Sequence, residues 1–83
     1  MTNTPNFVGI DVSKAQLDVA VRPSDEHDTL VYDAAGIDTL IARLRPVAPT
    51  LIVLEATGGW ERPLVRALVA AALPVIVANP RHV

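Results

Sequence analysis

Five short runs of aliphatic and β-branched residues divide this chain, and they constrain its fold more than any other feature. Residues 7–12, 17–21 and 29–32 follow one another with short polar connections, including residues 23–28, as in an antiparallel meander. Residues 50–54 and 75–78 are continuous apolar runs, which are typical of strands covered on both faces. The sequence therefore predicts three consecutive strands and, later, two further strands.

The segments that separate the last strands have helical spacing. The first, which Pro46 closes, follows Gly36 and repeats apolar residues at intervals of three and four: Ile37, Leu40, Ile41 and Leu44. The second covers residues 60–73, with Pro74 at its end and Leu64, Leu68 and Ala72 on one stripe. The order is β-β-β-α-β-α-β. Right-handed crossovers then predict an α/β fold with a mixed five-stranded sheet of order 3-2-1-4-5, in which strand 2 is antiparallel.

Composition limits the class of protein. With 83 residues the chain is one domain at most, and with 51% apolar residues it is too apolar to be disordered. It has no cysteine, which excludes disulfides and thiolate metal sites. With a net charge of −2, the chain lacks the basic surface that is typical of a nucleic-acid binder. Residues 1–6 are expected to form a disordered tail without signal-peptide character, and a cytoplasmic location is expected.

Asp11 and Glu55 are the acids that stand within or at the end of apolar strand runs. Desolvating an unpaired carboxylate is costly, so an acid in this position needs an explanation. Alternation along the first strand places Asp11 on the face opposite its aliphatic neighbours. If the first and fourth strands are adjacent, the two acids lie side by side near their carboxyl ends, where open α/β sheets bind ligands.

Two carboxylates in this arrangement repel each other, and a hard divalent cation relieves the repulsion. Mg²⁺ binds one or two carboxylates and keeps water ligands that a phosphate can replace. A metal site at Asp11 and Glu55 is therefore the prediction. The structural alternative makes Asp11 a turn or cap residue and Glu55 a cap of the following helix.

Three segments resemble motifs of one protein family. VGIDVSKAQLDVAV (8–21), LEATGGWERPLVRAL (54–68) and VANPRHV (77–83) are similar, in order and spacing, to motifs of the DEDD-type insertion-sequence transposases. The catalytic domain of that family is ribonuclease-H-like and resembles the RuvC Holliday-junction resolvase. The resemblance implies a transposase that binds DNA and catalyses metal-dependent DNA strand cleavage and transfer.

The resemblance also implies which residues act. Asp11 matches the first Asp of the family and Glu55 its Glu, so both are expected as catalytic residues and as ligands of Mg²⁺ or Mn²⁺. The other two Asp belong to a helix after the Asn-Pro motif, and a further domain supplies a serine. Residues 7–83 are therefore expected to be the incomplete N-terminal part of the domain, truncated after strand 5 and inactive alone. The implied partners are DNA through the full-length protein, a guide RNA as in some members, and further copies of the chain.

The candidate phosphate or DNA contacts are Lys14, Gly58, Gly59 and Arg62. Each has a plainer reading: Lys14 as a solvated charge, the two glycines with Thr57 as a tight turn with an N-cap, and Arg62 as an ion-pair partner of an acid. The same holds for Arg66, and for Arg81 and His82 near the predicted site edge. Asp18 is expected at the surface or paired with Lys14. Trp60 is expected to cover the core more readily than to stack on a base.

Two other functions fit parts of the sequence. ATP-binding domains of the actin and sugar-kinase type share the strand and helix order and open with Gly-x-Asp, but their hairpin turn carries glycine, which the turn at residues 13–16 lacks. A non-catalytic assembly module that self-associates through an apolar face is the second alternative.

Overall fold

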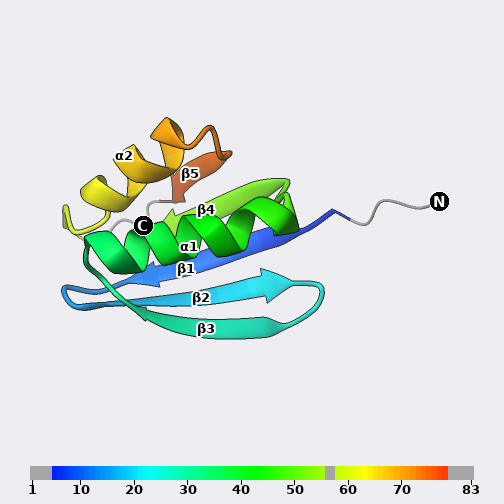
Figure 1. The fold of residues 1–83 in the computed structure, drawn as a ribbon, viewed down its shortest axis with the longest axis horizontal. Helices are drawn as coiled ribbons and strands as arrows, with labels where there is room; N and C mark the ends of the chain where they lie inside the picture. The colour runs from blue at the N-terminus through cyan, green and yellow to red at the C-terminus, as the bar shows by residue number, and fades with distance from the viewer. Residues whose placement is uncertain (1–4, 56–57, 79–83) are drawn as a thin grey trace, which may run out of the picture.

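The computed structural model describes residues 5–55 and 58–78. Its elements are β1 (Phe7–Val12), β2 (Gln16–Arg22), β3 (Glu26–Val31), α1 (Ala34–Val47), β4 (Leu51–Glu55), α2 (Arg62–Ala70) and β5 (Val75–Ala78) (Figure 1). They form one five-stranded sheet of order β3-β2-β1-β4-β5, so the predicted element order and strand order are confirmed.

The sheet is mixed, as predicted. β1 pairs antiparallel with β2, and β2 with β3, whereas β4 is parallel to both β1 and β5. The first hairpin turns where Ser13 donates its backbone N–H to the carbonyl oxygen of Gln16 at 2.9 Å. In the second hairpin Asp25 adopts a φ of 65°, a conformation that aspartate tolerates better than most residues.

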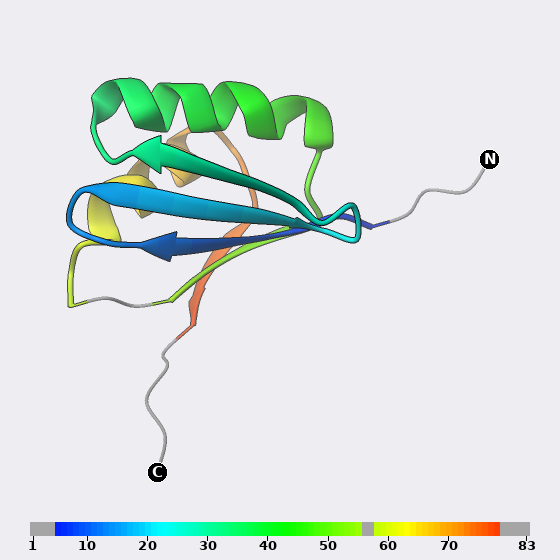
Figure 2. The ribbon, with the colours of Figure 1, turned by 90° about the horizontal axis from the view of Figure 1, so that it is seen from below.

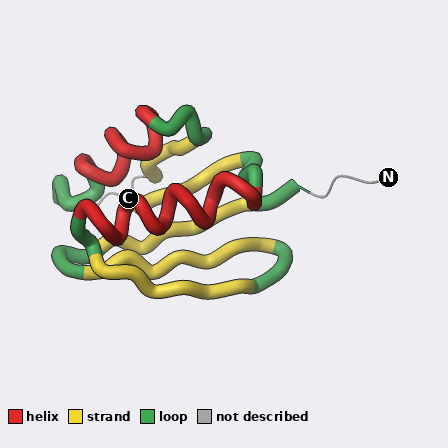
Figure 3. The backbone as a smooth tube through the Cα atoms, in the orientation of Figure 1, coloured by secondary structure: helices red, strands yellow, loops and turns green. Residues whose placement is uncertain are grey.

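Both helices pack on the same face of the sheet, and the opposite face carries no helix among the described residues (Figures 2 and 3). The buried side chains come from alternating strand positions and from one stripe of each helix. They form a single aliphatic core: Val8, Ile10, Val12, Leu17, Val19, Leu40, Leu44, Ile52, Leu54, Leu64 and Leu68. One face of the sheet therefore holds the fold together, and the other is open.

The first helix starts before Gly36 and ends after Pro46, so the predicted helix is too short at both ends. Asp33 is the N-cap, and its carboxylate accepts the backbone N–H of Gly36 at 2.7 Å. Gly36 lies inside the first turn, where a Cβ atom would stand 1.7 Å from the carbonyl oxygen of Val31. Its small size lets the helix start directly against the end of β3. The helix closes at Ala48, which has a φ of 51°.

Other expectations are corrected as well. β3 begins at Glu26, not at residue 29, because backbone pairing with β2 continues through the polar residues 26–28 of this edge strand. The fourth and fifth strands are covered on one face only: in β4 Val53 is half-buried, and in β5 Ile76 is 49% exposed. The second helix spans residues 62–70 and not 60–73, and the chain turns at Ala72, which has a φ of 61°.

At the N-terminus, hydrogen bonds to the rest of the fold begin at Asn6, one residue before β1. Asn6 donates from its side chain to the carbonyl oxygen of Val47 at 3.1 Å, and its own carbonyl accepts the N–H of Thr50 at 2.7 Å. The expected tail therefore does not include Asn6, and residues 1–4 lie outside the described part. Neither described helix is long and apolar enough to cross a membrane.

Candidate functional site

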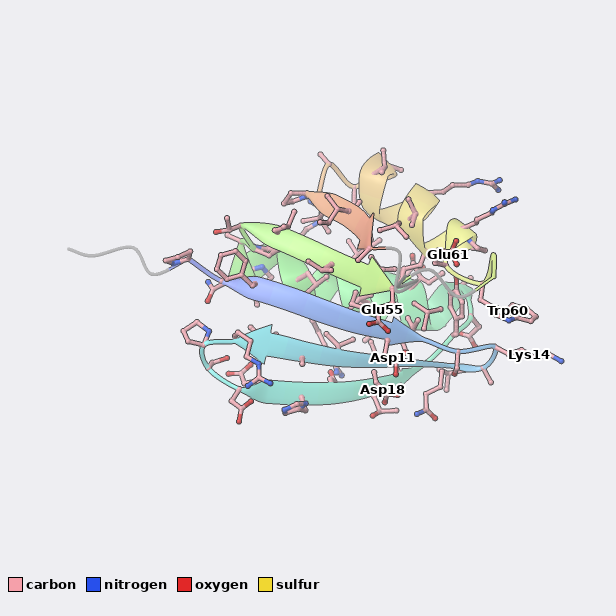
Figure 4. All side chains as sticks on the ribbon, turned by 180° about the vertical axis from the view of Figure 1, so that it is seen from behind. Asp11, Lys14, Asp18, Glu55, Trp60 and Glu61 are labelled. Atoms are coloured by element: carbon pink, nitrogen blue, oxygen red, sulfur yellow. The ribbon has the colours of Figure 1, made fainter. Side chains whose placement is uncertain are left out.

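The pairing of three strands brings three carboxylates to the open face of the sheet (Figure 4). In the parallel register Ile10 is the partner of Leu54, so Asp11 and Glu55 follow at neighbouring positions on strands about 4.8 Å apart. In the antiparallel register Asp11 is paired directly with Asp18. Asp11 and Glu55 are exposed and lie together, as the strand pattern predicted.

The acids border an open groove on this face. Its lining comes from β1, β2 and β4: Gly9, Ile10, Asp11, Asp18, Ala20, Val53 and Glu55. Gly9 and Ala20 are paired across the strands, so the smallest side chains of the face form the floor beside the acids. A Cβ atom at Gly9 would meet nothing within 4 Å. Among the described residues, the space above Gly9 is therefore unobstructed.

Asp18 differs from the other two acids in its hydrogen bonds. Its carboxylate accepts from the hydroxyl of Thr29 at 2.9 Å and from the side-chain amide of Gln16 at 3.2 and 3.3 Å. The pairing with Lys14 considered from the sequence is absent. No hydrogen bond or ion pair is seen between Asp11 or Glu55 and another described residue, and both side chains are exposed.

This donor set suits part of a metal site. Carboxylate oxygens are the ligands that Mg²⁺ and Mn²⁺ prefer, and two of them leave positions for water and phosphate. Within residues 5–55 and 58–78, no three acidic, histidine or cysteine side chains gather closely enough to enclose an ion. The described chain therefore offers two neighbouring ligands, Asp11 and Glu55, and no closed cage.

Lys14 and Trp60 lie together beyond the carboxyl ends of β1 and β4 (Figure 4). Lys14 is in the β1–β2 turn, and its ammonium lies 6.0 Å from the centroid of the Trp60 ring. Trp60 is 49% exposed and precedes α2, so the expectation that it covers the core is wrong. The residue stands in the turn before α2, at the rim of the molecule (Figure 4).

The glycines of this loop have the backbone angles that only glycine adopts readily: φ is 72° at Gly58 and 107° at Gly59. The N–H of Gly59 donates to a carboxylate oxygen of Glu61 at 3.1 Å, so an internal acceptor occupies this candidate phosphate donor. The N-cap of α2 is Glu61, not Thr57. Arg62 is the first residue of the helix and is exposed, as is Arg66 one turn later.

Tyr32 is a residue of this region that the sequence did not indicate. Its hydroxyl donates to the carbonyl oxygen of Trp60 at 2.5 Å and accepts the N–H of Leu64, an otherwise free amide of the α2 N-terminus, at 3.1 Å. Burial raises the pKa of the Tyr32 hydroxyl, against the lowering effect of the Leu64 bond, and the negative charge of Glu61 raises it further. The tyrosine thus ties the loop after Glu55 to the end of β3.

Several residues of the sequence motifs are outside the described residues. These are Ala56 and Thr57 of the second motif and the whole of residues 79–83, which include Arg81 and His82. Their predicted roles stay predictions.

The fold and the sequence both match known proteins. The structure of T. thermophilus RuvC in complex with a Holliday junction substrate is similar to this chain, with a TM-score of 0.63 and 16% sequence identity over 93% of it. This chain spans 66% of the length of that RuvC chain, and at this identity the likeness shows the fold. A comparison with curated proteins finds no match.

The family comparison is more specific, and it agrees with the motifs that hold Asp11 and Glu55. Residues 8–83 match the IS110-type DEDD family, which is described as Transposase. Because this match covers nearly the whole sequence, the chain belongs to the IS110-type DEDD transposase family.

Proposed function

We propose that this chain is the N-terminal part of the catalytic domain of a transposase that cleaves and transfers DNA strands with the help of Mg²⁺ or Mn²⁺. The observation that carries the proposal is the juxtaposition of Asp11 and Glu55 on adjacent parallel strands of a RuvC-like sheet, in a chain of a transposase family. The transposase family supports DNA as the substrate, and the fold neighbour, which holds a Holliday junction, supports it further.

The proposed roles follow from the geometry. Asp11 and Glu55 would hold the metal ion, which supplies activation of the attacking oxygen and stabilisation of the leaving oxygen in phosphodiester chemistry. The floor of Gly9 and Ala20 would give the sugar-phosphate backbone room to approach the two acids. Lys14, in the β1–β2 turn, is the candidate cation for a phosphate outside the groove.

The test is strand cleavage and transfer by the transposase that carries this chain. Asp11→Asn or Glu55→Gln should lower the rate by at least about a thousandfold while the far-ultraviolet circular dichroism stays unchanged, because each removes a metal ligand. Asp38→Asn, which makes the same carboxylate-to-amide change at an exposed acid on α1, is the matched control and should retain the rate. Wild-type rates for either site variant would contradict the proposal.

The chain of 83 residues alone should not cleave DNA, because two carboxylates make an open and weak metal site. Metal-dependent cleavage by the purified chain, abolished by Asp11→Asn, would overturn this part of the proposal. The family resemblance adds a guide RNA as a second nucleic-acid partner, which a gel-shift assay with RNA from the element tests. Both nucleic acids would be met in the cytoplasm.

We also propose that the chain associates with further copies of itself. Phe7 is 43% exposed and Ile76 49% exposed on the face without helices, and β3 and β5 are both edge strands. Light scattering of the purified chain should give a mass above that of one chain at high concentration. A mass of one chain throughout the concentration range would contradict self-association.

A further inference from the structure

The exposed ring of Trp60 lies at the end of the molecule that the candidate site occupies. Trp60 follows Glu55 by five residues and Lys14 follows Asp11 by three, so both come from the loops that leave the carboxyl ends of the acid-bearing strands. Figure 4 shows both side chains projecting beyond these strand ends. A strand of DNA whose phosphate reached the acids would pass this rim with its neighbouring nucleotides.

The backbone that carries this exposed ring is held by hydrogen bonds. The hydroxyl of Tyr32 binds the carbonyl oxygen of Trp60 at 2.5 Å, and the Glu61 carboxylate binds the N–H of Gly59 just before it. These bonds fix the backbone on both sides of the tryptophan. A residue whose backbone is already ordered loses less conformational entropy when a partner stacks on its side chain.

Beside the ring is an open pocket that joins the β1–β2 turn to the start of α1. Its lining includes Lys14, Tyr32, Ile37, Gly59, Trp60 and Pro63. The lining suits a flat apolar partner, because it consists of an indole ring, an aliphatic side chain and a proline ring. One cation, Lys14, lies at the edge, and the carboxylate of Asp33 in the same pocket is engaged by the N–H of Gly36.

We propose that Trp60 and Lys14 form a binding site for an unpaired nucleotide of the DNA substrate: the base stacks on the indole ring and the phosphate pairs with the Lys14 ammonium. The proposal rests on the function proposed above for the identity of the nucleic acid, and it adds that the substrate is DNA with an unstacked nucleotide next to the scissile phosphate. A base offers a π-face to the ring, and a phosphate offers a charge to the lysine, which is the combination that single-strand binding sites use. A paired base inside a duplex cannot offer its face.

The chain contains one tryptophan, so its own fluorescence reports stacking on Trp60. The experiment titrates the purified chain, in buffer with EDTA, with three oligonucleotides of one sequence: single-stranded DNA, blunt duplex DNA and single-stranded RNA. Single-stranded DNA should quench the emission with saturation, and the blunt duplex should not. Because no metal is present, the result does not depend on metal binding by Asp11 and Glu55.

Variants assign the contacts. Trp60→Leu should weaken binding of single-stranded DNA, followed by anisotropy of a labelled oligonucleotide, roughly 5- to 100-fold, whereas Trp60→Phe should restore most of the affinity. Lys14→Gln should reduce the slope of log K against log salt by about 0.7, the contribution of one phosphate of a single strand. Val69→Ala is the control, since it shortens an exposed apolar side chain of α2 that does not line the pocket.

Quenching by duplex and single strand alike, quenching by RNA alone, or unchanged affinity in Trp60→Leu would each overturn this proposal. So would an equal loss in Val69→Ala. The cleavage test with Asp11→Asn and Glu55→Gln is independent of these results. A failure of the nucleotide-binding proposal is therefore distinguishable from a failure of the proposed function.

Discussion

The two faces of the sheet are built from alternate residues of the same strands, yet they have opposite chemistry. In β1 the residues that face the helices, Val8, Ile10 and Val12, are at most 3% exposed. The residues between them, Phe7, Gly9 and Asp11, face the side without helices. The alternation of side chains along each strand thus puts the core residues on one face and the candidate site residues on the other. Substitutions on the two faces should therefore have opposite effects on stability and activity.

The largest expected effect on stability comes from the covered face. Leu54 is fully buried, so Leu54→Ala should lower the free energy of unfolding by about 2–5 kcal/mol, because it removes packed methyl groups and leaves a cavity. Val53→Thr, one residue earlier on the open face, should change it by about 1 kcal/mol or less. Urea denaturation of both variants measures the difference. Equal losses would break the comparison.

Substitutions of two glycines provide a second comparison of the two faces. Gly36→Ala places a Cβ atom 1.7 Å from the carbonyl oxygen of Val31, so the start of α1 must move away from β3, at a cost of about 1–3 kcal/mol. Gly9→Ala on the open face meets nothing within 4 Å and should leave stability almost unchanged. Thermal denaturation followed by circular dichroism tests both, and a stable Gly36→Ala variant would show that the helix start is not tightly packed.

Tyr32→Phe should cost about 1–2 kcal/mol, since the hydroxyl makes one donated and one accepted hydrogen bond. The variant also has a signature in pH. The folded pKa of Tyr32 lies above the unfolded value of 10.0, so its contribution to stability is complete below about pH 10 and is lost as the pH rises through the folded pKa. Wild type should thus lose more stability than Tyr32→Phe between pH 9 and about 12. Parallel pH curves for the two proteins would contradict this role.

The smallest expected effect on stability belongs to the acids. Asp11 faces Asp18 directly across the antiparallel pair, and like charges in this arrangement destabilise a sheet slightly. Asp11→Asn should therefore raise the free energy of unfolding by a fraction of a kcal/mol, measured by urea denaturation at low salt, while it weakens metal binding. A clear loss of stability would mean that Asp11 supports the fold and not a site.

Much of this arrangement could be predicted from the sequence because it depends on local periodicity. The β-β-β-α-β-α-β order, the sheet order and the faces of Asp11 and Glu55 all follow from runs and alternation. The pairing of Asp11 with Asp18 also follows from a turn at residues 13–16, which fixes the register of the hairpin. Asp18 is exposed, as expected, but its hydrogen-bond partners, Gln16 and Thr29, follow from the strand register and not from its neighbours in the sequence.

Other features depend on contacts between distant residues and left no local pattern. Tyr32 binds the carbonyl of Trp60, 28 residues away, so neither the tyrosine bond nor the exposed ring could be read from its neighbours. The continuous apolar runs of β4 and β5 suggested cover on both faces, but the described residues supply helices to one face only. Apolar composition alone does not say what covers a strand.

The central claim is that Asp11 and Glu55 form a divalent-metal site on the open face, and paramagnetic broadening by Mn²⁺ in amide NMR spectra of the chain tests it most directly. A second acidic region, Asp25 in the β2–β3 turn and Asp28 in β3, provides an internal comparison, because these two acids are paired with Arg22 and Arg43. The account predicts that the amides of residues 9–12 and 53–55 broaden first, and that Asp11→Asn with Glu55→Gln abolishes this effect. Broadening centred on residues 25–28, or unchanged in the double variant, would contradict it.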